Sequence, residues 1–147
     1  MLSSIDVANY LLSLSDPEIG DVLTNLKLQK LVYYAQGFHL ALYDEPLFDE
    51  PIVAWTHGPV VYSLYQRFKE NGSQGIEKPE LSDDSPFSNE QKELLNEIYQ
   101  VYGQFSAWKL RNMTHEEKPW QETPPNGEIS RQSMAEFFKT LVQCPIV

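Results

Sequence analysis

Basic residues, cysteine and long apolar runs are all scarce in this sequence. Its 147 residues carry 11 Lys and Arg against 21 Asp and Glu, a formal net charge of −10. This charge repels polyanions, so direct DNA binding is not expected. Cys144 is the one cysteine, so no internal disulfide can form. The early apolar run Tyr10-Leu11-Leu12 is too short for a signal sequence or a membrane span, which favours a cytoplasmic protein without a membrane partner.

Signatures of common enzyme and metal sites are missing too. The chain has no glycine-rich phosphate loop, no Gly-x-Ser-x-Gly, no His-Glu-x-x-His and no Cys-x-x-Cys. Its three histidines and Cys144 show no spacing typical of zinc ligands. We therefore expect no catalytic residue, no metal and no cofactor, and hence no enzyme. The alternative is a small hydrolase or transferase in which His57 and His115 form an acid–base pair, which requires both imidazoles to share one cleft.

Apolar residues at helical spacing predict a mainly α fold. With 147 residues, 41% of them hydrophobic, the chain fits one domain spanning 1–147. The strongest pattern covers about 24–43, where apolar arcs on nearly opposite sides indicate a helix packed between others. Thr24 is placed to cap this helix. The prediction is a compact single-domain bundle of five or six helices around this central one.

Capping residues mark several other helices. Ser4 is placed to cap the first helix, and Ser88-Asn89-Glu90-Gln91 has the pattern of a capping box. Gly103 is placed to bend or end the helix that this box opens. Ser106 and Ser130 each precede a further helical segment, so both are expected to act as caps.

The chain between 44 and 87 is predicted to be less regular. Leu47-Phe48 and Ile52-Val53-Ala54-Trp55 flank an Asp-Glu-Pro turn, which predicts a small β-hairpin near 47–55. Pro59 is placed to begin the next helix. Residues 71–87 carry Gly, Pro and acids without apolar periodicity, which predicts a mobile, solvated acidic loop.

Lys27, Lys30 and Tyr34 occupy the narrow strip between the two apolar arcs of the central helix. One interpretation is an ordinary solvated edge, where lysine stems cover apolar neighbours. The other is a concentrated positive surface that binds a carboxylate-bearing partner. On the second interpretation, Lys27→Glu combined with Lys30→Glu would weaken partner binding and leave the fold intact.

Three ordered motifs carry a family resemblance. They are Leu26-Lys27-Leu28-Gln29-Lys30-Leu31-Val32-Tyr33-Tyr34-Ala35-Gln36-Gly37, Ala54-Trp55-Thr56-His57-Gly58-Pro59-Val60-Val61 and Thr114-His115-Glu116-Glu117-Lys118-Pro119-Trp120. Together they resemble the Panacea domain, the SocA-like antitoxin domain of bacterial and phage toxin–antitoxin operons. The resemblance extends over residues 1 to 142.

This resemblance implies a proteic antitoxin. Such a protein binds and neutralises a cognate toxin encoded in the same operon by direct protein–protein interaction. Part of the family resembles protease adaptors, so delivery of the toxin to a cellular protease is an alternative. Many relatives carry an N-terminal DNA-binding segment, and this chain begins with the domain, so no autoregulation through DNA is expected. A homodimer and a toxin–antitoxin hetero-oligomer both fit.

The motifs also indicate where a partner would bind. By resemblance they mark Lys27, Gln29, Lys30, Tyr33, Tyr34, Gln36, Trp55, His57, Gly58, Pro59, Thr114, His115, Glu116, Pro119 and Trp120. We expect Tyr33 to point into the core and Tyr34 to point outward. The predicted partner-binding residues are Lys27, Lys30, Tyr34, Trp55, His57, Tyr62, His115, Glu116 and Trp120.

Overall fold

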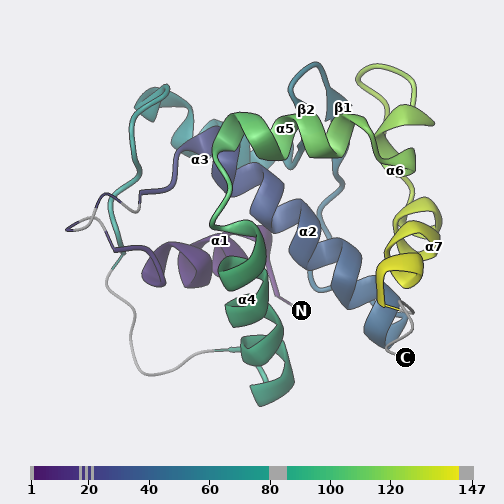
Figure 1. The fold of residues 1–147 in the computed structure, drawn as a ribbon, viewed down its shortest axis with the longest axis horizontal. Helices are drawn as coiled ribbons and strands as arrows, with labels where there is room; N and C mark the ends of the chain where they lie inside the picture. The colour runs from purple at the N-terminus through teal and green to yellow at the C-terminus, as the bar shows by residue number, and fades with distance from the viewer. Residues whose placement is uncertain (1, 17, 19, 21, 80–85, 143–147) are drawn as a thin grey trace.

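One long buried helix organises the fold. The structure, a computed structural model, describes residues 2–142 apart from 17, 19, 21 and 80–85. Helix α2 (Asn25–Tyr43) runs through the middle of the molecule, with α1 (Ser4–Ser13) and α4 (Asn89–Tyr102) on one side and α7 (Arg131–Val142) on the other (Figure 1). Thr24 caps α2 by accepting a hydrogen bond from the backbone N–H of Lys27 at 3.2 Å. The predicted central helix and its cap are confirmed.

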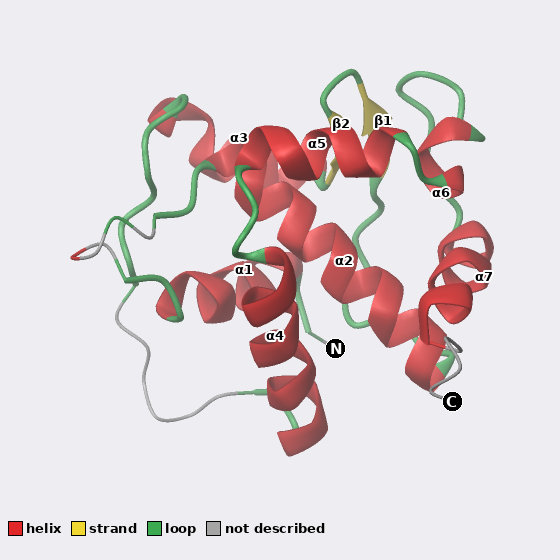
Figure 2. Ribbon diagram, viewed as in Figure 1, coloured by secondary structure: helices red, strands yellow, loops and turns green. Residues whose placement is uncertain are grey.

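The molecule is mainly helical, as the apolar spacing predicts (Figure 2). The described residues form seven α-helices, which also include α3 (Tyr62–Phe68), α5 (Ala107–His115) and α6 (Lys118–Gln121). A 3-10 turn, η2 (Lys69–Asn71), follows α3. The helix beyond the expected five or six is the single turn α6, which carries Pro119 in its first turn, where a missing N–H costs nothing.

Most of the predicted caps are confirmed. Ser88 forms the capping box of α4, Gly103 ends that helix, and Ser106 caps α5. Ser130 accepts a hydrogen bond from the N–H of Ser133 at 3.0 Å at the start of α7. The first cap is one residue earlier than expected: Ser3 and Asp6 form the capping box of α1.

Ser4 binds Glu50 instead of capping α1. Its N–H donates to Glu50 Oε1 at 2.6 Å, and its hydroxyl donates to the other oxygen of the same carboxylate. The side chain therefore connects α1 to the chain that follows α2, a long-range contact that local spacing does not encode.

The hairpin lies later in the chain than predicted. Strand β1 (Val53–Trp55) pairs antiparallel with β2 (Gly58–Val60) across a turn at Thr56 and His57. The expected pairing of β1 with Leu47-Phe48 is therefore wrong, because the backbone of those residues binds the side chain of Gln36. Pro59 lies in β2 and does not begin a helix, since α3 starts at Tyr62.

Helices α2 and α7 approach closely at a glycine. A Cβ placed on Gly37 would lie 2.1 Å from the ring of Phe138. The missing side chain lets the aromatic ring of α7 press against the backbone of α2. Phe138 is fully buried there and packs edge-on against Phe38, with ring centroids 4.8 Å apart.

The predicted acidic loop is only partly solvated. Ile76 is buried, and its N–H donates to Leu23 O at 2.7 Å. Phe87 is buried as well and packs edge-on against Tyr10. Two apolar residues thus anchor the segment, and they escaped the sequence analysis because isolated residues have no period. The predicted mobility of residues 71–87 stays a prediction, and residues 80–85 of this segment lie outside the described residues.

Candidate partner-binding site

Two glutamines of α2 hold neighbouring loops against the helix. Gln36 donates to Phe48 O at 2.9 Å and accepts from the N–H groups of Leu47 and Phe48 at 2.8 and 3.3 Å. Gln29 accepts from the N–H of Val61 at 2.9 Å. Both side chains are buried, so these bonds replace water for backbone groups that no strand or helix satisfies.

Lys30 lies on the inner side of the hairpin and is completely buried. Its Nζ donates to Pro59 O at 3.2 Å. Burial, reinforced by the nearby charge of Arg111, lowers the pKa of Lys30 to about 7. Gly58 leaves room for this side chain, because a Cβ at position 58 would lie 2.6 Å from Lys30 Cε. Its φ of +110° is also a conformation that glycine adopts more easily than other residues.

Glu117 is the acid at the centre of the polar core. It accepts hydrogen bonds from the hydroxyls of Tyr34 at 2.8 Å and Tyr33 at 3.4 Å. Burial raises the pKa of Glu117 to about 7, although both phenol hydrogen bonds act in the opposite direction. Burial and the adjacent carboxylate in turn raise the pKa of both tyrosines far above the usual value.

The predicted exposed strip on α2 is wrong. Lys30 and Tyr34 each expose 0% of their surface, and Tyr34 stacks on Tyr102 with ring centroids 4.1 Å apart. Lys27 is half-buried and donates to Gly103 O at 2.6 Å, so it holds the end of α4. Lys27 and Lys30 therefore position neighbouring backbone. The burial of Lys30 argues against the expectation that Lys27→Glu combined with Lys30→Glu leaves the fold intact. A charge in this core would have no water to solvate it.

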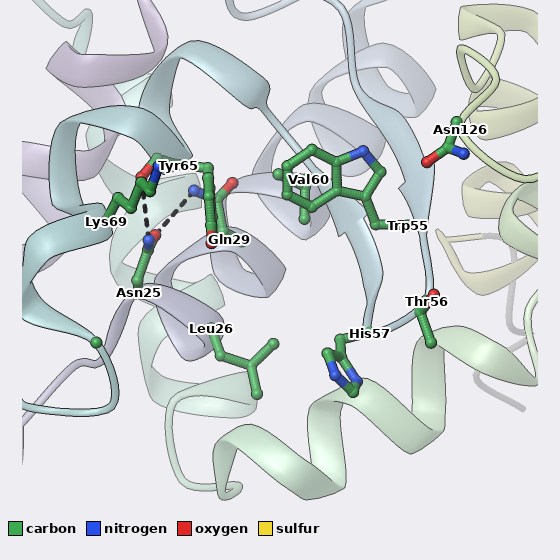
Figure 3. Close-up of a pocket in the computed structure, with 11 residues that line it drawn as sticks. Asn25, Leu26, Gln29, Trp55, Thr56, His57, Val60, Tyr65, Lys69 and Asn126 are labelled. Atoms are coloured by element: carbon green, nitrogen blue, oxygen red, sulfur yellow. Dashed lines mark hydrogen bonds between the residues drawn. The ribbon is translucent and has the colours of Figure 1, made fainter.

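A hollow of about 630 Å³ lies on one side of the hairpin (Figure 3). Asn25 and Gln29 are hydrogen-bonded to each other in its wall, at 3.0 Å, while Trp55 and His57 line it from the hairpin. Trp55 is half-buried and packs edge-on against Tyr62 and Tyr65, with ring centroids 5.7 and 5.0 Å apart. Two predicted site residues, Trp55 and Tyr62, thus form one aromatic cluster.

A second hollow, of about 480 Å³, lies between the hairpin and the α5–α6 segment. It is lined by His115 and Trp120, whose rings stack 4.0 Å apart, and by Trp55. Trp120 Nε1 donates to Trp55 O at 2.8 Å, which attaches the third motif to the second. Burial, followed by the charge of Arg111, lowers the pKa of His115.

The three sequence motifs therefore meet at the hairpin. The family model described as "Antitoxin SocA-like, Panacea domain" matches residues 28–121, which include most of the first motif and all of the other two. This chain belongs to the SocA-like Panacea family.

One curated relative supports this family. The chain is 31% identical over 125 residues to the Antitoxin SocA of Caulobacter vibrioides, strain NA1000 / CB15N. That alignment covers 78% of this chain and 66% of the relative, so the chain spans just under two thirds of the relative's length. No solved structure matches the chain significantly.

Most residues in the Panacea motifs have a structural role in this chain. Gln29, Lys30 and Gln36 bind backbone of the segments around α2. Exposed or half-buried members remain on the outer side of the hairpin and of α5–α6. These members are Trp55, His57, His115, Glu116 and Trp120, joined by the exposed Tyr62.

Two residues of the candidate site around the hairpin were missed in the sequence analysis. Glu117, a half-buried carboxylate, was passed over for its exposed neighbour Glu116. Arg111 precedes the third motif by three residues and lies outside the motif itself. Its Nε donates to His57 Nδ1 at 3.1 Å, and its guanidinium lies over Trp108 at 4.4 Å from the ring centroid. Its helical spacing from Thr114 and His115 was the signal available.

The two histidines do not share a cleft. His57 lines the first hollow and His115 the second, and each is held by different groups. His57 Nδ1 accepts from Arg111, whereas His115 stacks on Trp120. The acid–base hypothesis needs both imidazoles to face one substrate, and the two rings line different, adjacent hollows, which gives it no support.

The described residues contain neither a helix that could span a membrane nor a group that could hold a metal ion. Within 2–142, excluding the gaps at 17, 19, 21 and 80–85, no helix has the length and apolar character that crossing a membrane requires. The same residues contain no group of three or more His, Cys, Asp or Glu arranged to hold a metal ion.

Proposed function

We propose that this Panacea protein is an antitoxin that neutralises a toxin encoded beside it by binding it directly. The family supports the antitoxin role, and the curated relative is itself named an antitoxin. The surface around the hairpin supports binding as the means. It gathers aromatic side chains and two hollows on one exposed part of an otherwise acidic molecule.

The observation that carries this proposal is the exposure of large aromatic residues beside the hairpin. Trp108 exposes 55% of its surface and Tyr62 exposes 46%. Tryptophan, tyrosine and arginine are the residues that most often dominate the binding energy of protein interfaces. We therefore assign partner contact to Trp55, His57, Tyr62, His115, Glu116 and Trp120, and add Trp108 and Arg111 to them.

Lys30 and Tyr34 act on this surface indirectly. Both are buried behind the hairpin, where Lys30 holds the carbonyl of Pro59. They orient the contact residues and do not touch the partner. The protein works stoichiometrically in the cytoplasm, without a reaction of its own.

Co-expression with the neighbouring gene tests this function. Induction of that gene alone should arrest growth, and this protein should restore growth and co-purify with the gene's product. Tyr62→Ala combined with Trp108→Ala should abolish rescue and co-purification. A matched control is Val101→Ala combined with Leu141→Ala, which removes exposed apolar residues on α4 and α7 instead. Rescue that is equal in both double variants contradicts the assigned surface.

Toxin levels separate direct binding from protease delivery. Under direct binding, the toxin accumulates in complex with this protein while growth is restored. Loss of the toxin that depends on an intact cellular protease would establish the adaptor role instead. A neighbouring product that is harmless alone, or toxic yet unbound, overturns the antitoxin proposal.

A further inference from the structure

The hollow between the hairpin and α5–α6 has no acidic lining residue. The residues that line it are Ala54, Trp55, Thr56, Arg111, His115, Trp120, Gln121, Thr123, Pro125 and Asn126. The chain as a whole has 21 acids and 11 bases, whereas this hollow has a guanidinium and an imidazole in its wall and no carboxylate. Its electrostatic character is the opposite of the net charge.

Arg111 is held in place without a carboxylate partner. Its Nε donates to His57 Nδ1 at 3.1 Å, and its Nη1 donates to Asn112 Oδ1 at 3.0 Å. The guanidinium also lies over the Trp108 ring. None of these three neighbours is an acid, and Nη2 forms no hydrogen bond with any residue that the structure describes. Arginine usually pairs with an anion where it is fixed in this way.

Lys30 and His115 lie near Arg111, and no acid among the described residues forms an ion pair with it. Arg111 lies near enough to Lys30 and His115 to lower the pKa of each, after burial, which is the larger cause. Glu117 points to Tyr33 and Tyr34 instead. Arg111 itself forms no ion pair with a described residue, whereas Arg131 and Lys139, on α7, pair with Asp49 and Asp44. The positive charge around Arg111 lacks a counter-charge.

His115 adds an unsatisfied polar atom to the same wall. Its Nε2 is buried and has no hydrogen-bond partner among the described residues. Buried polar nitrogens are normally paired, and exceptions mark places where a ligand or water completes the structure. The imidazole that carries this nitrogen is one of the residues that line the hollow.

We propose that this hollow receives the side-chain carboxylate of an acidic residue of the partner protein, with Arg111 as its principal donor. The identity of that partner, the toxin, rests on the proposed function. The free edge of the guanidinium can hold a carboxylate with two parallel hydrogen bonds. Trp55, Trp120 and Pro125 supply apolar walls for the methylene groups behind the carboxylate. Those walls favour Asp or Glu over a free phosphate, which has no apolar part.

A small carboxylate probe tests the hollow without the partner. N-acetylglutamate N-methylamide should shift the NMR signals of the Trp120 indole N–H and the His115 ring saturably, and the matching glutamine compound should not. Arg111→Gln should weaken probe affinity at least about tenfold. His115→Phe, which keeps the stack on Trp120, should weaken it less. Arg131→Gln is the matched control, since it removes an exposed arginine on α7 that pairs with Asp49.

The second test of the carboxylate site measures binding to the neighbouring gene product. Arg111→Gln should weaken that complex at least about tenfold, and Arg131→Gln should not. An Asp→Asn and Glu→Gln scan of the partner should find one position that weakens the wild-type complex equally. That substitution should add nothing to Arg111→Gln, as expected for two groups that bind each other.

Each outcome decides between the two proposals. Equal probe binding by the glutamate and glutamine compounds, or full partner affinity in Arg111→Gln, overturns the carboxylate site and leaves the antitoxin function standing. Tighter binding of inorganic phosphate than of the glutamate compound overturns it in favour of a free-anion site. If the glutamate compound binds selectively and depends on Arg111, but no complex forms with the neighbouring gene product, the carboxylate site is supported. The acidic residue that fills it then belongs to a different protein.

Discussion

Gly58 lies directly against the buried side chain of Lys30. A Cβ at position 58 would lie 2.6 Å from Lys30 Cε and 2.8 Å from Thr114 Oγ1. Each of these residues comes from a different sequence motif, so the three motifs meet at one point where no further atom fits. The close packing here explains why a glycine, a lysine and a threonine occur together in a core.

Gly58→Ala should therefore destabilise the fold. The added methyl group overlaps Lys30 and Thr114, and alanine strains a backbone at φ +110°. We expect a loss of at least about 2 kcal/mol in the free energy of unfolding, measured in urea. Gly72→Ala is the control, because Gly72 also has positive φ, +58°, but open space around it. Equal losses in both variants would show that strain alone, and not the packing on Lys30, explains Gly58.

The half-buried Glu117 should make stability depend on pH. Burial raises its pKa from 4.5 to about 7, so between these values the folded state holds more protons than the unfolded state. The free energy of unfolding should fall as the pH rises from 4.5 to 7, by on the order of 3 kcal/mol. Lys30 affects stability mainly above pH 7, because its pKa is lowered from 10.5 to about 7 in the folded state. Between these values the unfolded state holds more protons, so the free energy of unfolding should rise with pH there.

Glu117→Gln isolates this effect. Urea unfolding at pH 4.5, 5.5 and 7 should show a flatter profile in the variant than in the wild type. Glu116→Gln changes an exposed carboxylate next to it and should retain the wild-type profile. A profile that is the same in all three proteins would contradict a raised pKa at Glu117.

Gln36 should be among the most sensitive polar residues of the core. Gln36→Met removes one donor and one acceptor that together satisfy three backbone groups of Leu47 and Phe48. Each buried group left unpaired costs about 1–3 kcal/mol, so the variant should lose about 3 kcal/mol or more. Gln66→Met, on the exposed side of α3, should change stability little. A loss for Gln36→Met no larger than for Gln66→Met would refute the proposed role in holding the loop.

Trp120 and Trp108 should respond differently to the same substitution. Trp120→Phe removes the hydrogen bond to Trp55 O and should lower the free energy of unfolding by about 1 kcal/mol. Trp108→Phe alters an exposed ring without such a bond, so stability should stay near that of the wild type. Urea unfolding followed by far-UV circular dichroism compares them. Equal stability of the two variants would mean that the Trp120 bond contributes nothing.

Local chemistry made several helices predictable. Thr24, Ser88, Ser106 and Ser130 satisfy backbone N–H groups within three residues, so their role follows from spacing alone. The same holds for the central helix, whose apolar positions on two sides require neighbours on two sides. These features depend on contacts that are near in sequence.

Long-range contacts made the site harder to predict. Lys30 and Tyr34 have the spacing of an exposed strip, yet Pro59 O and Glu117 supply partners for them inside the protein. No residue near α2 in the sequence indicates that Pro59 O and Glu117 will be the partners of Lys30 and Tyr34. The three motifs were correctly grouped by resemblance, but which of their side chains point outward depends on how the hairpin folds back over α2.

The hairpin also limits how a partner can attach. The outer edge of β1 is occupied, because Ala54 exchanges backbone hydrogen bonds with Asn126 and Gly127 at 2.8 and 2.9 Å. The outer edge of β2 is occupied as well: Pro59 has no N–H, its carbonyl binds Lys30, and the N–H of Val61 binds Gln29. Neither edge of this sheet is therefore free for β-augmentation, and the proposed function requires a toxin to be recognised through side chains on either side of the ribbon.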